Sequence, residues 1–316
     1  AKLTVMSGDS QDSGESRRET LELDDVFSVL GDETRIEILI QLAEIASEKG
    51  IGSGLGFSAL QDRVGVTDSG RFNYHLDKLT GQFVAKADGE YVARWPALML
   101  IAAIHAGLYG DTTAFESESA ATEFRCSECH DTLEVRFAEG TLGTGVYMHC
   151  EEHGRMDDYW FPPGAQSGRS LRDAMRVAYT RLLTNVRLAR QGICMECWGR
   201  VSTDYPAGRP DGAPEGAMPQ EEYTFVRFQC ERCWNQLRVP LRTYIMTHAV
   251  VEAAFARRGY ERLDATDMLT AERGVTCEEV VVSEQPPRRS VGITFDDETL
   301  VVSVDEECSV SDWRWD

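Results

Sequence analysis

Lysine is scarce in this sequence. It occurs at only four of the 32 basic positions (Lys2, Lys49, Lys78 and Lys86), so the other 28 are arginine. Acidic residues number 53, which gives a formal net charge of -21. Most of such a surface repels phosphate, so a protein that binds nucleic acid through a broad basic face is excluded.

This combination of scarce lysine and abundant carboxylates resembles the proteome of a halophilic archaeon. Hydrated carboxylates and a high net charge keep a protein soluble in concentrated salt. An ordinary acidic cytosolic protein is the alternative. Both interpretations predict a cytoplasmic protein.

Long hydrophobic runs are also missing. The longest, at residues 97–108, is shorter than the roughly 18 residues that a membrane span requires. The N-terminus has no basic segment that leads into an apolar stretch. A hydrophobic content of 42% and a charged content of 27% are typical of globular proteins. We therefore expect a soluble, intracellular protein of two or three domains with no membrane partner.

Motifs of catalysis are absent as well. The sequence has no nucleophile with a partner base, no paired acids in a known motif and no complete phosphate-binding loop. We interpret the short run "GSGLG" at residues 52–56 as a loop that precedes a helix. An enzyme is therefore the least favoured class, and no catalytic residues are predicted.

The N-terminal third shows a pattern of helices and one hairpin. Residues 1–20 are polar and without periodicity, which predicts a disordered tail. Apolar spacing then predicts helices that begin near Leu21, at Asp32, at Ser58 and at Asp68 or Ser69, with stops at Gly50 and Gly81. Asp88-Gly89 joins two alternating segments and predicts a hairpin, before an apolar helix at 96–107. This order over residues 21–110 predicts a winged helix-turn-helix domain.

Two stretches, "VLGDETRIEILIQLAE" and "FSALQDRVGVTDSGRFNYHLDKLTG", resemble the ArsR-type winged-helix regulators. The resemblance covers about residues 22–108 and rests on Asp32, Thr34, Arg35, Ile38, Leu39, His75, Leu76 and Leu79. It implies a DNA-binding transcriptional regulator that dimerises through its last helix. Metal-sensing members place cysteine or histidine on the recognition or final helix. No cysteine precedes Cys126 here, so that kind of metal response is not implied.

The predicted DNA-reading surface is the helix at 68–81 and the hairpin that follows. Between residues 68 and 94, four acidic residues are balanced by four basic ones, so this stretch is neutral. Phe72, Leu76 and Leu79 share one face, which leaves the opposite face polar. Arginine pairs with guanine and asparagine with adenine, while serine, tyrosine and lysine commonly hold phosphates. The predicted contacts to double-stranded DNA are Ser69, Arg71, Asn73, Tyr74, Lys78, Lys86 and Arg94.

Two alternatives remain open at this surface. Its charged side chains are also compatible with an ordinary solvated helix, and we expect His75 to hydrogen-bond inside the domain. The apolar helix at 96–107 predicts a homodimer through Leu98, Ile101 and Ile104. Packing of that helix against the rest of the chain is the alternative.

Seven of the nine cysteines lie in pairs separated by two residues, one pair completed by a histidine. Such spacing lets one tight turn aim two ligands at one metal ion, and two turns supply the four ligands of Zn²⁺. The sequence predicts two structural Zn²⁺ ions, held by Cys126, Cys129, Cys150 and His153 and by Cys194, Cys197, Cys230 and Cys233.

Other residues near these pairs are weaker candidates. His130 and His149 are sequence neighbours of ligands, but only His153 keeps the two-residue spacing. Disulfides are the rival interpretation of the cysteines. Cys277 and Cys308 have no partner at metal spacing and are expected to be buried free thiols.

Together these patterns predict an α+β protein with a duplicated C-terminal region. A first zinc ribbon and helix are expected at 120–192, and a second zinc ribbon and helix at 193–316, the latter with a C-terminal antiparallel sheet of about three strands. The Gly/Pro-rich segment 206–222 predicts a mobile loop.

Our interpretation is a homodimeric, nucleoid-associated regulator that occupies promoter DNA. The alternative is a basal factor that acts through RNA polymerase contacts, since a winged helix followed by a zinc ribbon is also the layout of the archaeal transcription factor E alpha subunit. The sequence does not decide between repression and activation, or whether a small effector binds the C-terminal region.

Overall fold

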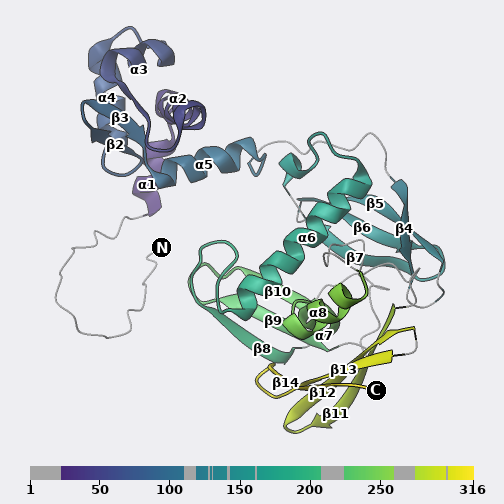
Figure 1. Ribbon diagram of the computed structural model, residues 1–316. Coiled ribbons are helices and arrows are strands. Elements are labelled where there is room, and N and C mark those ends of the chain that lie inside the picture. The colour runs from purple at the N-terminus through teal and green to yellow at the C-terminus, as the bar shows by residue number, and fades with distance from the viewer. Residues whose placement is uncertain are drawn as a thin grey trace, which may run out of the picture. The chain divides into compact units, whose positions relative to one another are not determined.

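The computed structural model describes residues 23–109, 119–126, 129, 131–140, 143–160, 162–207, 224–259, 275–296 and 298–316 (Figure 1). The chain forms two compact units, one up to Asp111 and one from Thr112. The predicted disordered tail and nearly all of the predicted loop at 206–222 lie outside the described residues. In the part of the chain that the structure describes, no helix is long and apolar enough to cross a membrane.

The first unit consists of short helices around a small antiparallel sheet of order β1-β3-β2. Its elements are α1 (Leu23–Leu30), α2 (Glu33–Lys49), β1 (Gly54–Gly56), α3 (Phe57–Val64), α4 (Ser69–Leu79), β2 (Val84–Ala87), β3 (Glu90–Ala93) and α5 (Trp95–His105). The predicted N-caps of two helices are confirmed. Asp32 accepts a hydrogen bond from the Arg35 amide at 3.2 Å, and Asp68 accepts one from the Gly70 amide at 2.8 Å.

Two local predictions in this unit are wrong. Residues 54–56 are not a loop but strand β1, in which Gly54 pairs with Val92 of β3. Strands β1 and β3 approach so closely that a Cβ at Gly54 would lie 2.5 Å from the Tyr91 carbonyl oxygen. A glycine is therefore needed here for the two strands to pair. Ser58 does not cap α3, because that helix begins at Phe57 and its N-cap is Gly56, without a side-chain hydrogen bond.

The core of the first unit lies between α2, α4 and the sheet. Ile38, Leu39 and Leu42 of α2 are fully buried, and so are the predicted inward residues of α4, which are Phe72, Leu76 and Leu79. Burial of such side chains is worth about 1.5–3 kcal/mol each, which fixes the rotation of α4 about its axis. The opposite face of α4 therefore points to solvent.

The second unit begins with a four-stranded antiparallel sheet and a long helix. The strands are β4 (Ser119–Arg125), β5 (Thr132–Gly140), β6 (Gly143–Cys150) and β7 (Gly154–Trp160), in that order across the sheet. A 3-10 turn (Pro163–Ala165) leads into α6 (Leu171–Arg190), which the Ser170 side chain caps. Leu171, Met175 and Tyr179 of α6 pack on Phe124 and Val135 of the sheet.

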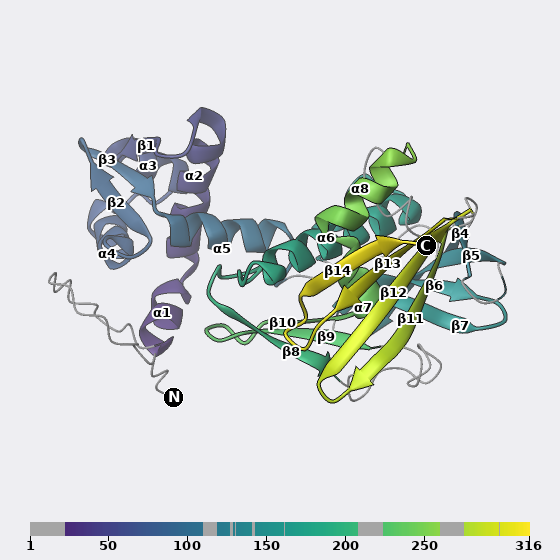
Figure 2. The same cartoon turned by 60° about the horizontal axis from the view of Figure 1, so that its bottom comes forward.

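The rest of the second unit combines a second three-stranded sheet with a C-terminal sheet. Its elements are β8 (Val201–Ala207), β9 (Phe225–Cys230), β10 (Gln236–Pro240), α7 (Leu241–Met246), α8 (Ala249–Arg257), β11 (Val275–Glu284), β12 (Pro287–Phe295), β13 (Glu298–Val304) and β14 (Val310–Trp315). Strands β11 to β14 lie side by side in chain order (Figure 2). The C-terminal sheet thus has four strands rather than about three, and α7 was not predicted.

One hydrophobic core joins these parts. Val226 and Phe228 of β9, Ile245 of α7 and Val291 and Ile293 of β12 are all buried in it. The C-terminal sheet therefore packs on the second module rather than standing apart. The predicted α+β class is confirmed, because helices alternate with antiparallel sheets throughout the described residues.

A buried arginine reinforces this connection. The guanidinium of Arg289 on β12 donates to the Thr224 hydroxyl at 3.0 Å and to the Ser283 carbonyl at 3.0 Å. It also pairs with Glu284 at 3.1 Å and lies 3.8 Å from the carboxylate of Glu279. Burial raises the pKa of Glu279, against the opposing effects of Thr224 and Arg289. Arg289 thereby ties the edge of the C-terminal sheet to the start of β9.

Candidate functional site

The first metal cluster consists of Cys126, Cys129, Cys150 and His153, as predicted, and its ligand atoms all lie within 4.8 Å of one another. Cys126 and Cys129 lie at the turn between β4 and β5, and Cys150 and His153 at the turn between β6 and β7. The Cys129 and Cys150 sulfurs are 3.5 Å apart, and His153 Nδ1 lies 3.4 Å from the Cys126 sulfur. Antiparallel pairing of the strands thus closes one cluster from two turns.

The second metal cluster consists of Cys194, Cys197, Cys230 and Cys233, again as predicted. The first two residues precede β8, and the last two follow from the end of β9. The Cys194 and Cys233 sulfurs are 3.6 Å apart, and the Cys197 and Cys230 sulfurs are 3.5 Å apart. The two turns are bound to each other through a hydrogen bond from the Glu231 amide to the Arg200 carbonyl at 3.0 Å.

Both clusters have the geometry of metal sites rather than of disulfides. All seven cysteines in them are free thiols in the structure. A tetrahedral metal with bonds of about 2.3 Å to sulfur places its ligands about 3.8 Å apart, close to the observed separations. Each cluster can therefore hold one metal ion with little movement of its side chains.

Each cluster contains one thiol of raised pKa and one of lowered pKa. The amides of Asp131 and Asn235 favour ionisation of Cys129 and Cys233, but burial and hydrogen bonds with neighbouring cysteines outweigh them and raise the pKa of both thiols to about 12. Burial opposes ionisation of Cys230, but the amides of Cys233 and Arg232, each 3.4 Å from its sulfur, outweigh burial and lower its pKa to about 6. In the first cluster burial again opposes ionisation, but His153 outweighs it and the pKa of Cys150 falls to about 7. Thiolates are the form that binds metal.

The other candidate ligands fall outside the two quartets. His149 lies 3.7 Å from the Glu151 carboxylate and belongs to neither metal cluster. Asp131 and Glu152 lie near Cys129, where exposed carboxylates border the first cluster. His130 lies outside the residues that the structure describes.

The two remaining cysteines differ from each other. Cys308 is buried as predicted, but the prediction that Cys277 is buried is wrong, because its side chain is exposed on strand β11. Cys277 pairs with the buried Ile293 of β12 and so lies on the core-facing side of the sheet, but β11 is the edge strand and no neighbouring strand covers this side chain beyond it.

The predicted DNA-reading residues lie on the exposed side of the first unit. Ser69, Arg71, Asn73, Tyr74 and Lys78 on α4 are all exposed, and so are Lys86 on β2 and Arg94 just before α5. Asn73 donates to Asp77 at 2.8 Å, and the Ser69 hydroxyl donates to Gln61 at 3.1 Å. The ammonium of Lys78 lies 5.7 Å from the Tyr74 ring centroid. All seven side chains are thus accessible to solvent.

Residues that carried the family resemblance form a buried polar cluster beneath α4. The Arg35 guanidinium donates to the carbonyl oxygens of Val29 and Ser28, and it lies 3.4 Å from His75 Nδ1. His75 is also 3.3 Å from the Asp32 carboxylate. His75 therefore bonds within the unit, as expected, and Arg35 of α2 links α1 to His75 of α4.

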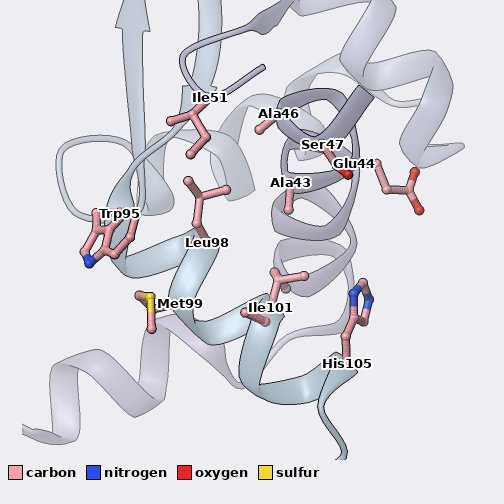
Figure 3. A pocket seen from close by; sticks show the side chains of 11 residues that line it. Ala43, Glu44, Ala46, Ser47, Ile51, Trp95, Leu98, Met99, Ile101 and His105 are labelled. Atoms are coloured by element: carbon pink, nitrogen blue, oxygen red, sulfur yellow. The ribbon is translucent and has the colours of Figure 1, made fainter. Parts of the chain in front are cut away.

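The three predicted dimer residues are placed differently. Ile101 is only 2% exposed and packs in the core of its own unit, so it is not free to contact a partner. Ile104 is 37% exposed. Leu98 lines a groove of about 430 Å³ between α2 and α5, to which Ala102 also contributes. Figure 3 shows the groove with Ala43, Glu44, Ala46, Ser47, Ile51, Trp95, Met99, Ile101 and His105 around it.

Sequence reasoning missed this groove and two exposed tryptophans at the second metal cluster. The groove is lined by residues of α2 and α5, which are distant in sequence, and by Ile51; the apolar sequence of α5 was a signal for it. Trp198 and Trp234 each follow a ligand cysteine directly, and that repeat was readable in the sequence.

These features define a two-unit α+β protein whose second unit carries two clusters of four side chains that could each hold a metal ion. The chain belongs to the family described as a domain of unknown function, DUF7351, whose model matches residues 123–310. A second model, also described as a domain of unknown function, DUF7347, matches residues 23–104. No curated protein and no solved structure matches the chain.

Proposed function

We propose that this protein is a transcriptional regulator whose first unit is a winged helix-turn-helix domain of the ArsR-like type. In this proposal α3 and α4 form the helix-turn-helix, α4 enters the major groove of double-stranded DNA, and the β2–β3 hairpin is the wing. The order of elements and the resemblance of both sequence stretches support it. Such a protein acts on the genome and is expected at the nucleoid.

The observation that carries the proposal is the division of α4 into two faces. Phe72, Leu76 and Leu79 are fully buried, so Arg71 and Asn73 must face outward near the N-terminal end of the helix. Recognition helices present these first turns to base edges. The Arg71 amide donates to Asp68, but the Arg71 guanidinium has no hydrogen-bond or ion-pair partner among the described residues and is available to guanine. Asn73 must exchange its bond to Asp77 to reach a base.

The net charge of the protein does not oppose this assignment. The stretch from Asp68 to Arg94 is neutral, although the whole chain carries a formal charge of -21. Salt weakens the contribution of phosphate contacts to affinity, so hydrogen bonds to bases and apolar contacts carry a larger share in strong salt. A neutral reading surface is suited to that regime.

We infer that both metal clusters hold Zn²⁺ and that both are structural zinc ribbons. Three or four thiolates with at most one imidazole are the preferred donors of Zn²⁺, and four protein ligands leave no open position for a substrate. Metal analysis of the purified protein should give about two zinc ions per chain. One ion or none would contradict this assignment.

We further propose that the regulator is a homodimer through the α5 region. Leu98 and Ile104 offer apolar surface beside the groove between α2 and α5, while Ile101 supports that surface from within the core. Two reading helices per dimer would give the specificity that one short helix lacks.

The decisive experiment is genome-wide crosslinking in the native cell, comparing the unaltered protein with an Arg71→Ala/Asn73→Ala variant. The proposal predicts discrete genomic sites that the variant loses. Arg314→Ala is the matched control, because Arg314 is exposed on β14 and pairs only locally with Asp316 among the described residues. Occupancy that survives the double change contradicts the reading helix, and signal at every active promoter favours a basal factor that binds RNA polymerase.

A further inference from the structure

Two tryptophans occupy equivalent places in the two turns of the second metal cluster. Trp198 directly follows Cys197, and Trp234 directly follows Cys233. Their backbones share a left-handed conformation, with φ of 59° and 60°. Their side chains are 72% and 65% exposed. Among the described residues these are the two most exposed tryptophans, and both border the same cluster.

Neither backbone conformation nor packing explains a tryptophan at these positions. The residue that follows His153 in the first metal cluster is Gly154, with φ of 75°, so the same turn is formed there by the residue that suits it. A bulky side chain at positive φ is disfavoured, and an indole that stays in water gains little from burial. Both tryptophans cost local stability, and both lie at the same cluster. Their presence therefore points to a binding role.

The charges around the indoles indicate what they bind. In the segments 194–200 and 230–236, Glu196 and Glu231 are balanced by Arg200 and Arg232, and Arg181 adds one positive charge 3.9 Å from Glu196. Four thiolates around a divalent cation leave a net charge of about −2 at the cluster itself. This surface therefore repels phosphate, which disfavours a nucleic acid. It attracts cations, and the face of an indole binds guanidinium and ammonium groups.

We propose that Trp198 and Trp234 form a docking surface for a polypeptide segment that offers arginine or lysine side chains between apolar ones. Tryptophans of this kind dominate the binding energy at protein interfaces. The proposal goes beyond DNA binding and depends only on a metal ion in the second cluster. The protein would then hold DNA with one unit and a basic protein segment with the other.

The test uses the full-length, metal-loaded protein and fluorescently labelled peptides in which arginine alternates with leucine. Anisotropy titrations compare the unaltered protein with a Trp198→Gly/Trp234→Gly variant, which should bind at least about tenfold more weakly. Trp313→Ala is the matched control, because Trp313 is also exposed but lies on β14, and it should leave the affinity unchanged. Peptides with glutamate in place of arginine should not bind.

Several results would overturn the proposal. Equal affinity of both proteins for the arginine peptide would do so, as would tighter, tryptophan-dependent binding of single-stranded oligothymidine. Self-association that disappears in the double variant would assign the surface to a second copy of the chain. Metal content and melting temperature are measured on the same samples, and a loss of either in the glycine variant would assign the indoles a structural role. DNA occupancy, tested through Arg71 and Asn73, is read separately, so the two proposals can fail independently.

Discussion

The two metal clusters are built on the same plan and differ in what they add to it. Each takes two ligands from each of two turns at strand ends, and each buries two cysteines in the core beside it, Cys126 and Cys150 or Cys194 and Cys230. The first cluster replaces one thiolate by His153 and follows it with a glycine. The second keeps four thiolates and follows both pairs with tryptophan. The ligands thus define the fold of each module, while the residue after them is free to differ.

Loss of a ligand should have the largest effect in both clusters. Cys230→Ser should lower the metal content from two ions to one and unfold the second module, because metal binding worth about 10–16 kcal/mol in zinc-finger peptides stabilises such modules. Cys126→Ser should do the same to the first module and leave the second folded. Metal analysis and hydrogen exchange check this, and retention of both ions in either variant would contradict it.

His153→Cys is the control, because it gives the first cluster four cysteine ligands like those of the second. The protein should therefore still bind two ions.

The next largest effect should be a loss of stability in the second module alone, because only that module packs against the C-terminal sheet. Arg289→Met removes the cation that faces Glu279 in a buried site, and we expect a loss of about 3 kcal/mol. Addition of Glu279→Gln should recover part of that loss, since no unpaired carboxylate then remains. Urea unfolding followed separately for each module checks this; equal destabilisation of both modules would refute it.

A capping residue in the first unit offers a reference that involves no metal. Burial alone would raise the pKa of Asp32, but the Arg35 amide and the nearby His75 and Arg35 charges outweigh burial and lower it below 3.8. Because the pKa of Asp32 is lower in the folded than in the unfolded state, its carboxylate stabilises the unit fully at pH values above the unfolded-state pKa. This contribution is lost as the pH falls through the folded-state pKa. Asp32→Ala should cost about 1 kcal/mol at pH 7 and progressively less in acid. Thermal unfolding across pH checks this, with Asp32→Asn as a control that keeps the cap.

The smallest expected effects are changes in stability at the residue with positive φ that follows the last ligand of each cluster. These changes should have opposite signs in the two clusters. Gly154→Ala should destabilise the protein by about 1 kcal/mol, since a Cβ there meets open space and only the backbone is strained. Trp234→Gly should be neutral or stabilising by up to about 1 kcal/mol for the same reason. Differential scanning calorimetry measures both. A destabilised Trp234→Gly protein would show that the indole packs against the module.

Several parts of the structure were predictable because local chemistry fixes them. The spacing of cysteines and His153 predicted both ligand sets, since two residues between ligands suffice to aim both at one ion. Asp32 and Asp68 were predictable as caps, because a cap depends only on the next few amides. The apolar period of α4 likewise predicted which of its side chains are buried.

Other features depend on contacts that no local pattern records. Gly54 is in a strand only because Val92 pairs with it, and Cys277 is exposed only because β11 forms an edge of its sheet. In the sequence Ile101 is one of several equivalent apolar residues on its helix, and packing of α5 on α2 in the core of the first unit decided that it is buried.

The sequence by itself determined where metal ligands, helix caps and the faces of α4 lie, because each depends on neighbours within a few residues or on a regular period. Only the tertiary structure decided that the C-terminal strands share a core with the second module, that Arg289 is buried there, and that Trp198 and Trp234 are not covered. Those outcomes follow from which distant segments pack together, and long-range packing selects among many arrangements that the same local patterns allow.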